Sequence, residues 1–115
     1  MCGFAGQLGS ANLPAERLAE LGTQMAGRLR HRGPDDAGCW VNEPAGLVLA
    51  FRRLSILDLS PHGHQPMSSE GGRFTVVFNG EIYNHRELRR QLESEGARFR
   101  GTSDTEVMLA LLDHP

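Results

Sequence analysis

The chain has 115 residues, of which 39% are hydrophobic and 23% charged, and its formal net charge at pH 7 is -2. This length allows one domain, and the composition is that of an ordinary soluble globular protein. The near-neutral charge excludes the basic surface of a protein that binds nucleic acid or anionic membrane, and the absence of a long apolar run or a signal peptide favours a cytoplasmic protein.

The first half of the chain predicts a strand, a helix and a hairpin. Residues 3–9 alternate small and apolar side chains, which is typical of a buried strand with close backbone neighbours. After Pro14, leucine and methionine recur at helical spacing, and this helix should end near Arg30. Residues 37–42 and 46–51 have the pattern of two strands, and the short linker between them favours a hairpin.

The second half predicts a long loop, a strand and two helices. Residues 60–72 are rich in Pro, Gly, Ser and His, as in a functional or mobile loop. Residues 73–78 have the clearest strand pattern and end at an Asn-Gly turn dipeptide. Residues 84–87 and 103–106 resemble capping boxes and should begin two helices, the first of which ends at Gly96.

A cysteine directly follows the initiator methionine. Removal of Met1 would give Cys2 both a thiol nucleophile and a free α-amino group. An α-amino group has an ordinary pKa of roughly 7.7–8.0, so it can act as a general base near neutral pH. A nucleophile with its own base needs no His/Asp helper, but it does need an oxyanion hole and a substrate clamp.

Three further features each have a simpler structural interpretation. The Asn79 amide and the Gly80 N–H can point two donors at one oxygen, as an oxyanion hole requires, but on spacing alone a plain hairpin turn is the better interpretation. Arg53 follows an apolar strand and could bind a carboxylate, yet Arg52 beside it suits either this role or a structural ion pair. Asp104 could bind an ammonium group, although the dipole of its helix explains it equally well.

The histidines and cysteines do not form a metal or redox motif. His62 and His64 have ligand-like spacing, but no third ligand is near them in the sequence. Cys2 and Cys39 lack a close-spaced cysteine motif, so we expect two reduced thiols. We therefore expect neither a metal site nor a cofactor in this chain.

Six stretches of the chain are far more specific in combination than any one of them alone. They are Met1–Gly3, Arg30–Asp35, Arg53–Ile56, Gly63–Met67, Phe78–His85 and Ser103–Glu106. In this order they resemble the glutaminase domain of class II glutamine amidotransferases, and within that class the glutamine-hydrolysing asparagine synthetases. The resemblance runs from the first residue to the last.

The resemblance implies an α+β fold of the N-terminal-nucleophile hydrolase type, with two antiparallel sheets between helical layers. The family domain is longer, so we expect residues 1–115 to form its N-terminal part, with an incomplete sandwich and without the ATP-dependent synthetase domain. ATP and Mg²⁺ are expected only in that missing domain. The expected partners are glutamine and the C-terminal synthetase domain, without nucleic acid or membrane, and a homodimer stays open.

The resemblance also assigns a chemical role to the beginning of the chain. After removal of Met1, Cys2 matches the nucleophile, which would attack the side-chain amide of glutamine to give a γ-glutamyl thioester and ammonia. Asn79 and Gly80 match the oxyanion-hole pair. The loop Arg30–Asp35 is typical of the asparagine synthetase branch and would shape the site.

Glutamine binding is likewise assigned by resemblance. Arg53, rather than Arg52, matches the residue that binds the α-carboxylate, and Asp104 matches the residue that binds the α-ammonium with help from Glu81. The residues that follow Arg53 would line the pocket through their backbone. The full implied set is Arg53, Leu54, Ser55, Ile56, Leu57, Asn79, Gly80, Glu81 and Asp104.

The leading expectation is a glutaminase that supplies ammonia for the ATP-dependent conversion of aspartate to asparagine. Two alternatives stay open. The first is an amidotransferase of the same family with another acceptor, because the acceptor is chosen in the absent domain. The second is a truncated fragment with an intact-looking site but no turnover, because a sheet that lacks strands leaves edges and apolar faces uncovered.

Overall fold

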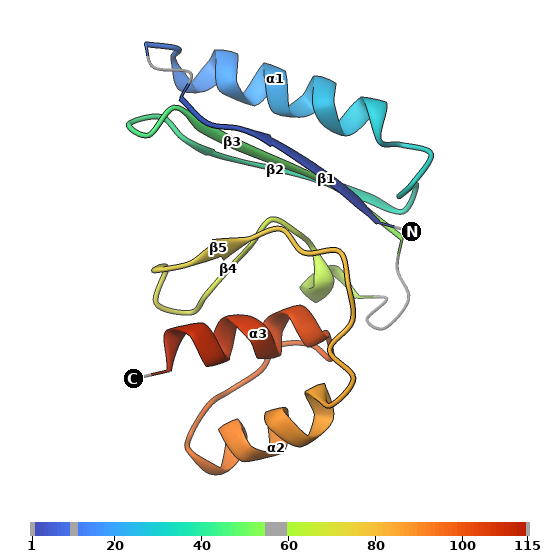
Figure 1. Ribbon diagram of the computed structural model, residues 1–115, viewed down its shortest axis with the longest axis vertical. Coiled ribbons are helices and arrows are strands. Elements are labelled where there is room, and N and C mark those ends of the chain that lie inside the picture. Colours follow the sequence, from blue (N-terminus) through green and yellow to red (C-terminus); the bar gives the residue numbers. More distant parts are fainter. Residues whose placement is uncertain (1, 10–11, 55–59, 115) are drawn as a thin grey trace.

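A computed structural model describes residues 2–9, 12–54 and 60–114. In chain order its elements are β1 (Gly3–Gln7), α1 (Ala15–Arg28), β2 (Asp36–Asn42), β3 (Leu47–Arg53), a short 3₁₀ turn η1 (Pro61–Gly63), β4 (Met67–Ser68), β5 (Thr75–Val76), α2 (His85–Ser94) and α3 (Asp104–Asp113). Four layers follow one another in space: α1, the sheet of β1, β3 and β2, the pair β4–β5, and α3, with α2 beyond (Figure 1). The expected α+β fold with antiparallel sheets is therefore confirmed.

The larger sheet is antiparallel, with β3 in the centre of the order β1-β3-β2. The predicted hairpin is confirmed: β2 pairs with β3 from Asp36↔Arg53 to Asn42↔Leu47. The predicted helix is confirmed as α1, which packs on β2 and β3 and in which Leu18 is fully buried. Gly22 of α1 lies so close to the sheet that a Cβ there would collide with the sulfur of Cys39. The strand predicted over 3–9 is present as β1, but its burial was predicted wrongly: of its five residues only Gly3 is buried, because its sheet neighbour lies on one edge alone and Phe4 is 50% exposed.

The prediction of a six-residue strand over 73–78 was wrong, because only Thr75–Val76 pairs, with Met67–Ser68. The partner segment explains the short ladder, since the backbone carbonyl of Gln65 faces Gly38 of β2 and the N–H of Phe78 donates to the Gln65 side chain instead. The segment predicted as a loop, 60–72, accordingly contains η1 and β4.

Both C-terminal helices begin where they were predicted, but their caps differ. Ser103 accepts a hydrogen bond from the backbone N–H of Glu106 at 3.3 Å, as a capping residue does. The side chain of Asn84 makes no such bond at the start of α2, so its capping box is not formed. Gly96 ends the helix as predicted, with a left-handed φ of 101° that suits glycine. No helix in the described residues is long and apolar enough to cross a bilayer.

The topology brings distant parts of the chain to one end of the two sheets. The start of β1 lies beside the end of β3, because Gly3 pairs with Arg52. From the second sheet, the chain after β5 leads to Asn79, and the N-terminal end of α3 lies at the same end of the molecule (Figure 1). Residue 2, the end of β3, residues 79–81 and the start of α3 therefore meet.

Candidate active site

An open cavity of about 200 Å³ lies at this meeting point. Of the predicted site residues, it brings together Cys2, Arg53, Leu54, Asn79, Gly80, Glu81 and Asp104. Ser55, Ile56 and Leu57 were also predicted to bind substrate, but they lie outside the described residues. The remaining lining residues were not predicted as site residues: Phe51, Gly63, Gln65, Phe78, Ser103 and Thr105. Most of them belong to the quoted motifs, which was the available signal for finding them.

The sulfur of Cys2 is held by the backbone beyond β3. The N–H of Leu54 donates to Sγ at 3.3 Å, and the thiol donates to the carbonyl of Leu54 at 3.4 Å. This reciprocal pair follows from the register of β1 on β3, which places residue 2 beside the end of β3. Backbone groups rather than side chains therefore orient the thiol at the cavity wall.

The carbonyl of Cys2 is the second anchor of this residue. It accepts hydrogen bonds from Nδ2 of Asn79 at 3.0 Å and from Nε of Arg32 at 3.3 Å. Arg32 belongs to the charged loop after α1, so that loop does contact the candidate nucleophile. A side-chain amide has two N–H donors, and the bond to Cys2 uses one of them. Asn79 is thus bonded to the residue that carries the thiol.

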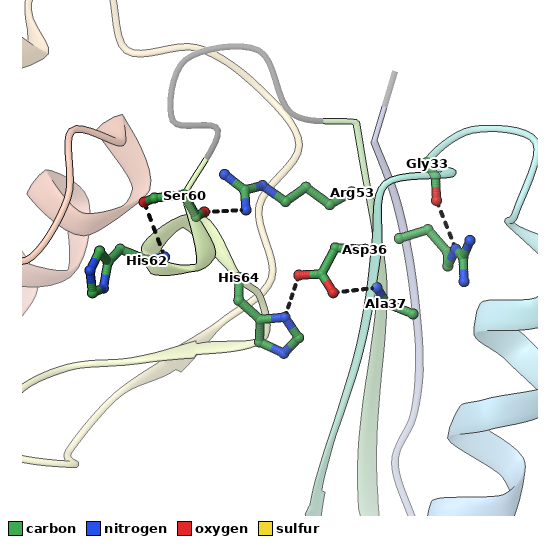
Figure 2. A network of polar contacts seen from close by, with 8 residues as sticks. Gly33, Asp36, Ala37, Arg53, Ser60, His62 and His64 are labelled. Carbon is green, nitrogen blue, oxygen red and sulfur yellow. Dashed lines mark hydrogen bonds and ion pairs between the residues drawn. The ribbon is translucent and has the colours of Figure 1, made fainter.

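The two neighbouring arginines point in different directions. Arg52 donates through Nε to the carbonyl of Gly33 at 2.7 Å and so holds the loop after α1. Arg53 is only 7% exposed, lines the cavity, and donates through Nη1 to the carbonyl of Ser60 at 2.6 Å (Figure 2). Among the ion pairs between described residues, none includes Arg53. Alternation along β3 therefore sends one arginine to the loop and the other to the cavity.

Asp104 supplies the opposite charge. It is the first residue of α3 and is only 5% exposed. Its Oδ2 accepts a hydrogen bond from the backbone N–H of Ile82 at 2.9 Å, which ties the start of α3 to the segment that follows Gly80. The cavity therefore presents a cation and an anion from different elements, an arrangement that complements the two charges of a free amino acid.

His62 and His64 take part in hydrogen bonds within the protein. His64 pairs through Nδ1 with Asp36 of β2, and Asp36 also accepts from the N–H of Ala37 (Figure 2). The backbone N–H of His62 donates to Oγ of Ser60 at 3.2 Å. In the part of the chain that the structure describes, no group of three or more His, Cys, Asp or Glu residues could hold a metal ion.

Cys39 is not part of the cavity. Its sulfur lies against Gly22 of α1, on the face of the larger sheet opposite the smaller one. Although the residue as a whole is exposed, partial burial of the thiol raises its pKa. Both cysteines are free thiols in the structure.

Comparison with known proteins shows the family of this chain. The glutamine amidotransferase domain family matches residues 1–114. Asparagine synthetase [glutamine-hydrolyzing] 1 of Bacillus subtilis is 45% identical over 115 residues, which are 99% of this chain and 18% of that protein. Asparagine synthetase [glutamine-hydrolyzing] 1 of Arabidopsis thaliana is 41% identical over 114 residues, 98% of this chain and 18% of that protein. Amidase chry2 of Gibberella zeae is 43% identical over 86 residues, 75% of this chain and 13% of that protein.

The chain thus spans less than a fifth of the length of these relatives. The family match, however, covers nearly all of the chain. On this match, the chain belongs to the glutamine amidotransferase domain family.

Proposed function

We propose that this domain hydrolyses glutamine to glutamate and ammonia through a thioester on Cys2. The observation that carries the proposal is the hydrogen bond from the Asn79 amide to the carbonyl of Cys2, inside a cavity that Arg53 and Asp104 flank. It joins a candidate nucleophile, a candidate oxyanion donor and two opposite charges in one place. Membership of the family supports the choice of glutamine as substrate.

The proposed chemistry begins with removal of Met1, which makes the amino group of Cys2 available as a base. This amino group takes the thiol proton, and the sulfur attacks the carbon of the side-chain amide. The second N–H of the Asn79 amide and the N–H of Gly80 stabilise the oxyanion of the tetrahedral intermediate. The amino group then protonates the leaving ammonia, and water hydrolyses the thioester to release glutamate.

Substrate orientation is assigned to the two charges. Arg53 binds the α-carboxylate, and Asp104, with help from Glu81, binds the α-ammonium. Leu54 and the three following residues line the same pocket. Each charge-assisted hydrogen bond of this kind contributes about 1.5–3 kcal/mol, enough to hold the side-chain amide against the sulfur.

We assign the domain to the N-terminal-nucleophile hydrolase fold, whose two antiparallel sheets between helices agree with the order of layers here. In the whole protein, the ammonia would serve the ATP-dependent amidation of aspartate, as the names of two relatives suggest. This reaction would take place in a C-terminal synthetase domain and in the cytoplasm. The match to an amidase keeps a different acceptor as the second candidate.

The test is substitution of the nucleophile in the full-length gene product. Cys2→Ala should abolish glutamine hydrolysis and glutamine-dependent amidation but spare amidation with added ammonia. Cys39→Ala is the matched control, because Cys39 lies outside the cavity, and it should leave all three activities unchanged. N-terminal sequencing should find Cys2 as the first residue. Loss of the ammonia-dependent reaction, or survival of glutamine hydrolysis in Cys2→Ala, would contradict the proposal.

A further inference from the structure

The side chain of Gln65 is almost completely buried in the wall of the cavity, with 6% of its surface exposed. Its Oε1 accepts from the backbone N–H of Phe78 at 2.6 Å, and its Nε2 donates to the carbonyl of Phe78 at 3.2 Å. The same Nε2 lies 3.3 Å from Oγ1 of Thr105, the residue after Asp104. One amide group thus satisfies both backbone groups of the residue that precedes Asn79.

The register of the small sheet explains why a side chain makes these bonds. Met67 pairs with Val76, and continuing the antiparallel register by two residues would place Gln65 opposite Phe78. The backbone of Gln65 does not form this rung, because its carbonyl faces Gly38 of β2 instead of β5. The side-chain amide, which has the same donor and acceptor as a peptide group, therefore replaces the missing backbone rung.

The consequence concerns the residues that follow Phe78. Without a partner, the half-buried backbone of Phe78 would lose its hydrogen bonds and move to recover them. Such a shift would move Asn79 and Gly80, because they come next in the chain. Rotating a donor by a small amount weakens an oxyanion hole severely, since a misplacement of about 1 Å can reduce a rate on the order of a hundredfold.

We propose that Gln65 is a positioning residue, which holds the Asn79–Gly80 donors on the oxyanion through the backbone of Phe78. This rests on the proposed function, but it adds a residue that touches neither substrate nor thiol in that mechanism. The hydrogen bond from Nε2 of Gln65 to Oγ1 of Thr105 also fixes the nitrogen of this side-chain amide. Gln65 therefore acts on the rate of the chemical step and has little effect on the charges that bind glutamine.

The test is steady-state glutaminase kinetics of Gln65→Met, which keeps the length of the side chain and removes its hydrogen bonds. We expect kcat to fall about 10- to 100-fold, with KM changed less than about threefold. Ser68→Ala is the matched control: it removes an exposed hydrogen bond to Thr75 in the same hairpin, outside the cavity, and should leave kcat unchanged. Gln65→Glu keeps the acceptor for the N–H of Phe78 but sets a carboxylate oxygen against the carbonyl of Phe78, so it should also lower kcat. It provides a second measurement if Gln65→Met does not fold.

A double-mutant cycle separates positioning from general destabilisation. In an Asn79→Ala background one of the two donors is already lost, so Gln65→Met should cost much less there than in the wild type. An undiminished cost, or wild-type kcat in Gln65→Met or Gln65→Glu, would overturn the inference. Cys2→Ala is measured alongside: if it is inactive while Gln65→Met is normal, only the role of Gln65 fails, whereas an active Cys2→Ala removes the proposed function itself.

Discussion

Replacing Gly63 by alanine tests the proposed binding of the glutamine α-carboxylate by Arg53 without changing Arg53 itself. Gly63 ends the turn η1, is buried, and has a φ outside the left-handed region, so its backbone accepts alanine. The space that a Cβ would occupy is filled by Arg53. The added carbon would lie 2.7 Å from Cζ and 3.3 Å from Nε of the guanidinium, and still closer to Nη2. The guanidinium must therefore move.

The expected size of the effect follows from the contacts of Arg53. Its Nη1 donates a hydrogen bond to the carbonyl of Ser60, and its guanidinium is packed against Gly63. A displaced guanidinium would therefore no longer point into the cavity. Loss of one charge-assisted hydrogen bond to the substrate carboxylate costs about 1.5–3 kcal/mol. Since 1.4 kcal/mol corresponds to a factor of ten, KM for glutamine should rise about 10- to 100-fold. On this proposal, Arg53 binds the α-carboxylate equally strongly in the substrate and in the transition state, so kcat should change little.

The assay is glutamate release as a function of glutamine concentration, with Gly27→Ala as the matched control. Gly27 is an exposed glycine of α1, and a Cβ there would meet nothing within 4 Å. Alanine at this position should leave KM unchanged and raise the stability of the helix by up to about 1 kcal/mol. The α-carboxamide of glutamine lacks the α-carboxylate, so its KM should exceed that of glutamine in the wild type. In Gly63→Ala the two KM values should be similar. An unchanged KM in Gly63→Ala, or a fall in kcat at constant KM, would refute the assignment of Arg53.

Three further predictions concern the framework of the site. Gly38→Ala should destabilise the protein by about 1–3 kcal/mol in urea unfolding, because its Cβ would collide with the backbone carbonyl of Gln65; an unchanged midpoint would contradict the close packing of β2 on that segment. Ser103→Ala should cost about 1 kcal/mol, because the cap of α3 is lost, and equal stability of the two proteins would show that the cap bond is not formed. In Cys2→Ala, the pH midpoint for alkylation of Cys39 should be higher in the folded than in the urea-unfolded protein. Because the thiol of Cys39 then ionises at lower pH in the unfolded protein, its contribution to stability is lost as pH rises above the ordinary thiol pKa of about 8.5. Equal alkylation midpoints in the folded and unfolded protein would contradict the burial of this thiol.

The parts of the fold that sequence reasoning predicted are those in which burial produces a period. The helix after Pro14 buries one face, and the central strand β3 of the predicted hairpin is largely buried, so apolar residues recur there with the period of the element. The segment 73–78 shows the limit of this reasoning. Its own residues suit a strand, but the length of a ladder also depends on the partner, and the backbone carbonyl of Gln65 on the partner segment faces Gly38 instead of Phe78.

The site was predictable to the extent that it depends on residues in motifs. Cys2, Arg53, Asn79 and Asp104 were all named from the sequence, and the structure brings them to one cavity. Local pattern alone left the choice between Arg52 and Arg53 open, and the pairing of Arg52 with Gly33 is a fact of tertiary structure.

The contribution of Gln65 illustrates what no pattern contains. A glutamine in a loop has many possible partners, and its role here exists only because the register of β4 on β5 places Phe78 opposite it. A side chain that replaces a backbone rung is recognised only from the pairing geometry.

The thiol, the guanidinium and the carboxylate of the site share one mode of support, because each is hydrogen-bonded to a backbone group. The thiol of Cys2 is bonded to Leu54, the guanidinium of Arg53 to the carbonyl of Ser60, and the carboxylate of Asp104 to the N–H of Ile82. Among the described residues, no ion pair includes either of the two charges. Had the cation and the anion paired with each other, a substrate would have to break that pair before it could bind. Because backbone groups hold Arg53 and Asp104 separately, this cost does not arise when the amino acid of the proposed function binds between them. Little rearrangement should therefore accompany binding.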